Sequence, residues 1–191
     1  MHEEIPGVAV DGPPRPKASS LDDGNRVRFH PAGLASLDAD AREAPADASL
    51  EELNELYEIR FTLEPLATEI ATTRLSDEEL VGLERIVAEM RDASPTRFVE
   101  LNREFHSRIH PAAARPRLSV LIDGLVESAA GYIRMNIDRY DAAYREEVQA
   151  EHEAILAALR SGAPSWAAHA MRLHLAHSGR HVANLIEKSR A

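Results

Sequence analysis

Apolar residues recur at helical spacing along most of the chain, and this pattern begins near residue 49. From there on they fall three or four positions apart, as in Leu80, Leu83 and Val87, which places them on one face of a helix. Residues 1–48 show no such period and hold six of the eleven prolines and four of the nine glycines. The pattern predicts an irregular, partly disordered arm over residues 1–48 and an all-α domain over residues 49–191.

Capping residues and prolines divide this domain into separate helices. Ser49 to Glu52 and Ser76 to Glu79 both have the spacing of a capping box, and Gly162 supplies a residue that can end a helix in the left-handed conformation. The helices predicted in this way run over about 49–75, 76–92, 95–110, 116–138, 142–160 and 164–188. Long helices joined by short turns predict an antiparallel bundle of six or seven helices.

Pro65 lies inside the first predicted helix. Proline lacks the N–H that an interior position donates, and its ring crowds the preceding turn. We therefore expect a kink, or a break into two helices, near residues 61–64.

Composition and charge exclude several classes of protein. The 191 residues contain no cysteine, which excludes disulfide scaffolds, thiolate metal sites and cysteine nucleophiles and is consistent with a cytoplasmic protein. The N-terminus lacks the features of a secretory signal, and no apolar run reaches the roughly 18 residues of a membrane helix. The formal charge of −10, without any Lys/Arg-rich run, argues against binding to nucleic acid.

Polar residues at interior positions of three predicted helices suggest a metal site. Asn102 and His106 are four residues apart and share a helix face, and His152 and His174 lean toward the apolar faces of two later helices. One such histidine alone is usually a core residue that donates to a nearby carbonyl. Three together favour a divalent ion, because burying three imidazoles is costly unless each finds a partner. His169, His177 and His181 are interpreted as solvated or supporting residues.

Several segments resemble one known family. They are Glu55–Arg60 with Leu63–Ala67, Leu101–His106, Glu151–Ile155 and Ala170–Leu175. In this order and spacing they resemble the ligand-binding FCD domain in the FadR branch of GntR-type bacterial transcriptional regulators, over about residues 49–188. The resemblance implies an antiparallel helical bundle, often dimeric, which holds a divalent ion and binds a small carboxylate against it.

The resemblance also implies a set of site residues. The metal ligands would be Asn102, His106, His152 and His174, with zinc or nickel as the expected ion and iron or manganese as alternatives. The family usually has Asp at the first of these positions, and a neutral amide there would leave the ion its full charge of +2. Arg60 matches an arginine that faces the effector pocket, although a structural ion pair with Glu58 or Glu64 is the competing interpretation. Arg134 is a weaker pocket candidate.

The expected function leaves two classes open. Regulators of this type carry a winged helix-turn-helix of about 60–70 residues, and the 48-residue arm has neither its length nor its helices, so we expect this chain alone not to bind DNA. The first hypothesis is a homodimeric, metal-dependent sensor of a small carboxylate. The second is a metalloenzyme, a lyase, isomerase or hydrolase, with Glu151 or His177 as acid–base group. Trp166 is interpreted as a core residue or a dimer contact.

Overall fold

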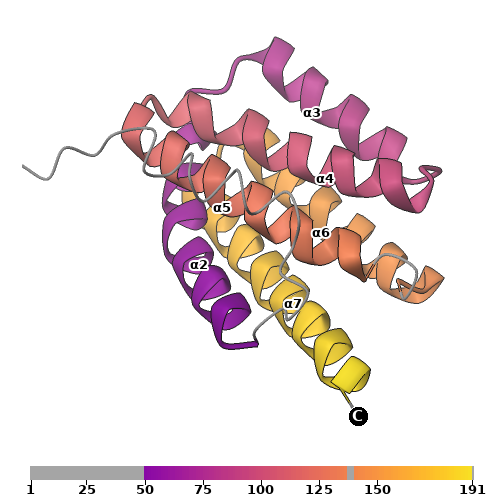
Figure 1. Ribbon diagram of the computed structural model, residues 1–191. Helices are drawn as coiled ribbons and strands as arrows, with labels where there is room; N and C mark the ends of the chain where they lie inside the picture. The colour runs from indigo at the N-terminus through magenta and orange to yellow at the C-terminus, as the bar shows by residue number, and fades with distance from the viewer. Residues whose placement is uncertain (1–49, 137–139, 191) are drawn as a thin grey trace, which may run out of the picture.

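The computed structural model describes residues 50–136 and 140–190, without the side chains of the last two (Figure 1). These residues form six α-helices and one short 3₁₀ helix, which confirms the predicted all-α bundle. The elements are α2 (Leu50–Thr72), α3 (Asp77–Met90), α4 (Pro95–Ile109), η2 (His110–Ala113), α5 (Pro116–Met135), α6 (Ala142–Arg160) and α7 (Pro164–Arg190). The predicted arm over residues 1–48, the cap at Ser49 and residues 137–139 lie outside the described residues.

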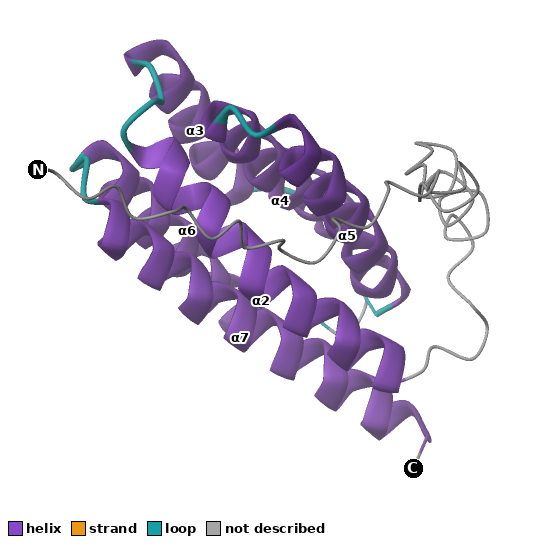
Figure 2. Cartoon of the chain, turned by 90° about the vertical axis from the view of Figure 1, so that its left-hand side faces the viewer, coloured by secondary structure: helices purple, strands orange, loops and turns teal. Residues whose placement is uncertain are grey.

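The longest helix, α7, forms the base of the bundle. It packs along α2 and also against α6, and the three helices lie side by side in Figures 1 and 2. On the other side α3 packs on α4 and α6, while α5 bridges α4 and α2. Because α4, α6 and α7 all contribute to one interior, polar residues on their inner faces are brought together.

The helix ends follow the predicted signals closely. The side chain of Ser76 accepts from the backbone of Glu79, and the Glu79 side chain accepts from the backbone of Ser76, which is a complete capping box. Ser94 and Asp141 cap α4 and α6, and Gly162 has the positive φ of 63° that follows the end of α6.

The expected break at Pro65 is wrong, because α2 continues through this residue to Thr72. Pro65 removes only one backbone hydrogen bond, and the ring is buried in the bundle. Tertiary packing therefore maintains the helix across a residue that breaks an isolated one. This continuity matters for the site, because it keeps Arg60 and Glu64 on the same buried face as Thr68.

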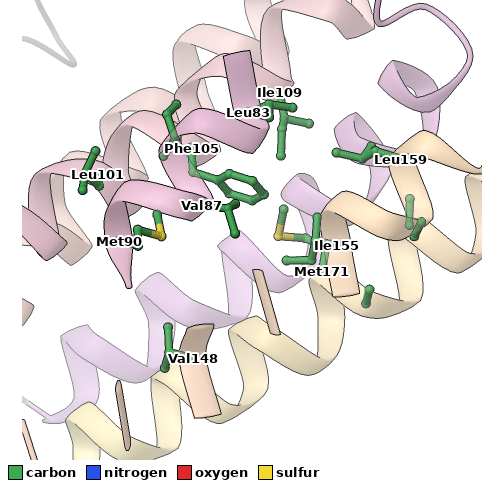
Figure 3. Close-up of a cluster of buried hydrophobic side chains, with 14 of the residues drawn as sticks. Leu83, Val87, Met90, Leu101, Phe105, Ile109, Val148, Ile155, Leu159 and Met171 are labelled. Atoms are coloured by element: carbon green, nitrogen blue, oxygen red, sulfur yellow. The ribbon is translucent and has the colours of Figure 1, made fainter. Parts of the chain in front are cut away.

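Apolar residues fill the space between the helices. Leu83 and Val87 of α3, Phe105 of α4, Ile155 of α6 and Met171 of α7 belong to one buried cluster (Figure 3). Smaller clusters join α2 to α5 and α7. Trp166 does not belong to the core: 48% of its surface is exposed, so the core interpretation of this residue is wrong. In the described part of the chain, no helix combines the length and the apolar character needed to cross a membrane.

Candidate metal centre

Three buried histidines from three helices meet inside the bundle. His106 comes from α4, His152 from α6 and His174 from α7, and each is at most 2% exposed. Their ring centres lie 5.9 Å apart for His106 and His152, 5.1 Å for His106 and His174, and 4.6 Å for His152 and His174. One nitrogen from each ring lies within 4.8 Å of the others, which brings the three sequence-predicted histidines into one group.

Hydrogen bonds fix which nitrogen of each ring carries the proton. Nδ1 of His106 lies 2.8 Å from Oε2 of Glu64, Nδ1 of His152 lies 2.7 Å from the carbonyl oxygen of Val148, and Nδ1 of His174 lies 2.9 Å from Oε2 of Glu151. All three partners are acceptors, so each Nδ1 donates its proton. The other nitrogen of each ring, Nε2, is then left to face the interior of the group.

The three Nε2 atoms lie close together. Nε2 of His106 and Nε2 of His174 lie 3.1 Å apart, and Nε2 of His152 has no hydrogen-bond partner among the described residues. With both Nδ1 protons in place, a hydrogen bond across this 3.1 Å gap requires a second proton on one of the two rings, whereas a cation among the three nitrogens would bind all of them. Imidazole nitrogens with their Nδ1–H groups held by carboxylates or carbonyls are a common donor set for zinc and related ions. The residues present thus fit a metal ion.

Burial keeps two of these rings, those of His106 and His152, in the neutral form that a metal needs. Burial lowers the pKa of His106 to about 4, and the neighbouring Glu64 only partly opposes this shift. Burial also lowers the pKa of His152 well below its usual range, and the nearby His174 and His106 add to the shift. Near pH 7 both rings are therefore neutral, and an ion would meet ligands that have no proton to displace from Nε2.

A buried ion pair supports His106 from α2. Burial opposes the ionised form of Glu64, but Arg60 and His106 outweigh it, so the pKa of Glu64 lies well below its usual range. Nε of Arg60 donates to Oε1 of Glu64 at 2.6 Å, and the two side chains are 3% and 0% exposed. The structural ion pair, one of the two interpretations of Arg60, is thus present.

A second carboxylate supports His174 from the solvent side. Oε2 of Glu151 accepts from His174, and Oε1 lies 2.6 Å from Nδ1 of His177, whose Nε2 lies 3.2 Å from Oε2 of Glu147. His177 thus contacts the carboxylate that accepts from His174, as a supporting residue would. Glu151, the acid–base candidate of the enzyme hypothesis, is engaged with two histidines in this arrangement.

His110 belongs to a second group of donors that sequence reasoning missed. It is fully buried at the start of η2, its Nε2 lies 3.6 Å from Oε2 of Glu64, and neither ring nitrogen has a hydrogen-bond partner among the described residues. Burial lowers its pKa to about 4. Glu64, His106 and His110 together form another set of potential ligand atoms. The signal was present in the sequence, because His110 follows His106 by one helical turn.

Asn102 lies one turn before His106 on α4 and is half-buried. It lines a small cavity that His174 also lines, together with the hydroxyl-bearing residues Tyr140, Tyr144 and Ser178. The Tyr140 hydroxyl is buried without a hydrogen-bond partner among the described residues. The cavity therefore offers polar contacts directly beside one of the three histidines.

The two arginines named from the sequence lie elsewhere. Arg60 is buried, but it does not line the cavity beside His174. The structure places Arg134 at the surface, 43% exposed, with Nη2 3.3 Å from Oε1 of Glu127, and Arg134 does not line that cavity either. Nothing in the spacing of the sequence distinguishes these two environments, since both residues lie on amphipathic helices.

Comparisons with known proteins agree with the fold. The FCD domain family matches residues 55–177. Among solved structures, Escherichia coli McbR/YncC has a TM-score of 0.64 at 20% identity, covering 73% of this chain and 66% of that one. GntR from Streptococcus agalactiae has a TM-score of 0.58 at 26% identity, covering 68% of this chain and 58% of that one. No curated protein sequence matches the chain.

Fold and match together define an effector-binding regulatory domain. The chain belongs to the FCD domain family, and the matched residues, 55–177, include every residue of the candidate centre. The chain spans 66% and 58% of the two solved chains, so it corresponds to only part of each of them.

Proposed function

We propose that the chain binds one divalent metal ion through Asn102, His106, His152 and His174 and binds a small carboxylate against that ion. The observation that supports this proposal is the set of three converging Nε2 atoms, each on a ring whose Nδ1 already donates to an acceptor. A divalent ion accounts for three nitrogens that point at one another from rings whose Nδ1 atoms already donate.

The donor set favours a particular class of ion and ligand. Three imidazoles suit zinc or nickel, with iron or manganese as alternatives, and Asn102 would add a neutral amide oxygen. With four neutral ligands the ion keeps its charge of +2, which attracts an anion to any open coordination position. The cavity beside His174 contributes hydroxyl groups but no cationic side chain, so the metal itself would be the main source of attraction for a carboxylate.

Elemental analysis and thermal shift measurements test the proposal. We expect about one zinc or nickel ion per chain after purification without chelator, and a melting temperature that rises when Zn²⁺ is added to the stripped protein. In a panel of small carboxylates, at least one compound is expected to raise the melting temperature of the metal-loaded protein and not of the EDTA-treated protein. Failure of the protein to retain or rebind any divalent ion would refute the metal-dependent function.

We further propose that the chain forms a homodimer. Large apolar side chains remain exposed on α7, where Trp166 and Leu173 are seven residues apart and so lie on the same face. Light scattering during size-exclusion chromatography measures the mass directly. A mass of about 42 kDa, twice the 21.1 kDa of the chain, is expected, and the monomer mass at micromolar concentration would contradict the proposal.

A further inference from the structure

Arg60 is engaged on two sides inside the bundle. Its Nε donates to Oε1 of Glu64 at 2.6 Å, and its guanidinium carbon lies 4.9 Å from the centre of the Tyr57 ring. The side chain is 3% exposed and does not border the cavity beside His174. A residue that captures the carboxylate of a ligand would need its guanidinium in that cavity.

The contacts of Glu64 connect Arg60 to a candidate metal ligand. While Oε1 accepts from Arg60, Oε2 accepts from Nδ1 of His106 at 2.8 Å. Because the two oxygens have different partners on opposite sides, the carboxylate cannot rotate without losing a charged hydrogen bond. The orientation of the His106 ring, and hence the direction of its Nε2, depends on Glu64 and through it on Arg60.

We infer that Arg60 is a positioning residue of the metal centre, acting through Glu64 on His106, and that it does not bind the carboxylate ligand. This inference rests on the proposed metal site. Of the two interpretations of Arg60, the inference favours the structural ion pair over a place in the effector pocket. The polar stripe of Arg60, Glu64 and Thr68, spaced four residues apart on the buried face of α2, is then part of the support of the centre.

The same contacts argue against a second ion between Glu64, His106 and His110. Nδ1 of His106 carries the proton that it donates to Glu64, and the charge of Glu64 is balanced by Arg60. A second ion would have to displace this proton and approach a buried guanidinium. We therefore infer that the chain takes up one divalent ion, with His106 binding it through Nε2 alone.

Substitutions of Arg60 separate positioning from capture of a carboxylate. Arg60→Met removes the partner of Glu64 and is expected to lower the affinity for Zn²⁺ by about 10- to 100-fold, measured by competition with a chromophoric chelator. Arg60→Lys, which keeps a charge beside Glu64, is expected to restore most of this loss. Arg108→Met is the matched control, because Arg108 forms an exposed pair with Glu104 at the same spacing, and it is expected to leave the zinc affinity unchanged.

The affinity of the zinc-saturated protein for acetate provides the second measurement. A positioning role predicts that Arg60→Met changes the acetate affinity by less than about threefold once zinc is saturating. Unchanged zinc affinity together with loss of acetate binding would show that Arg60 captures the carboxylate, and would overturn the inference. Two zinc ions per wild-type chain would overturn the conclusion about the second donor group.

The double variant Arg60→Met with Glu64→Gln keeps the test valid if the single variant fails to fold. It removes both buried charges, and its amide oxygen can still accept from His106, so we expect a folded protein whose zinc affinity is closer to wild type than that of Arg60→Met. Retained acetate binding in this zinc-saturated variant supports the inference, and its loss contradicts it. If the wild-type protein itself binds no zinc, the proposed function fails, which is a different result from any of these.

Discussion

His152 differs from the other two histidines in what holds its ring. Its Nδ1 donates to the carbonyl of Val148 in its own helix, whereas His106 and His174 donate to carboxylates on other helices. The Phe105 ring packs against it in a T-shaped arrangement, with the two ring centres 4.9 Å apart. The position of its Nε2 is thus determined mainly by α6 itself.

This residue provides a direct test of the centre. His152→Ala is expected to weaken Zn²⁺ binding at least ~10-fold because it removes one of three imidazole ligands. The circular dichroism signal of the helices is expected to remain, because the deleted ring is one side chain in an otherwise apolar core.

The control for this prediction is His169→Ala, since His169 is an exposed histidine on α7. It is expected to leave both zinc affinity and helix content unchanged. Equal losses of zinc affinity in the two variants would show that binding comes from surface histidines.

At the residue scale, the sequence predicted the convergence of the histidines but not the residues that orient them. His106, His152 and His174 could be found because an imidazole on an apolar helix face has few explanations. The sequence indicates Glu64 only as a possible ion-pair partner of Arg60, because an acidic residue one helical turn from an arginine is usually solvated. Its contact with His106 depends on how α2 packs on α4, and no local pattern encodes that geometry.

The close packing of α2 on α7 depends on one small residue. A methyl group added to Gly179 would lie 2.8 Å from Cδ1 of Tyr57, which is far too close. The Tyr57 hydroxyl also lies 3.0 Å from Oγ of Ser178. A larger residue at position 179 must therefore displace the ring and disturb this hydrogen bond.

We expect Gly179→Ala to lower the free energy of unfolding by about 1–3 kcal/mol, as other overpacked core positions do. Urea denaturation followed by circular dichroism measures the change. Gly124→Ala on α5 is the matched control, because nothing lies within 4 Å of the added methyl group. It is expected to be neutral or to stabilise by about 0.5–1 kcal/mol through helix propensity, so a similar loss in both variants would contradict the packing explanation.

At the element scale, helix ends were easier to predict than helix continuity. The capping box at Ser76 is a local signal, and the structure confirms it. The break predicted as one of two outcomes at Pro65 is wrong because the cost of proline is local, whereas the burial that compensates it comes from distant helices. The 3₁₀ helix at residues 110–113, between α4 and α5, was not predicted either.

For the whole molecule, the metal is expected to adjust stability without being needed for folding. The apolar clusters extend through all six α-helices, while the donor atoms of the centre lie in a small part of that interior. EDTA treatment is therefore expected to lower the melting temperature but to leave the helical circular dichroism signal in place at 25 °C. Collapse of that signal on chelation would show that the metal is a folding element.

The charge of the whole chain leads to a prediction about DNA. Specific duplex binding generally requires an element that reads a groove together with several phosphate contacts from Lys and Arg. This chain carries 22 basic against 32 acidic residues, and its resemblance to the FCD domain covers the effector-binding part of a regulator. We expect no sequence-specific complex at physiological salt in an anisotropy titration with duplexes from the neighbourhood of its own gene. A complex below about 100 nM that resists non-specific competitor would contradict this expectation. Such a complex would show that this chain contains a DNA-reading element. If no such complex forms, effector binding through the metal would have to act through a partner protein.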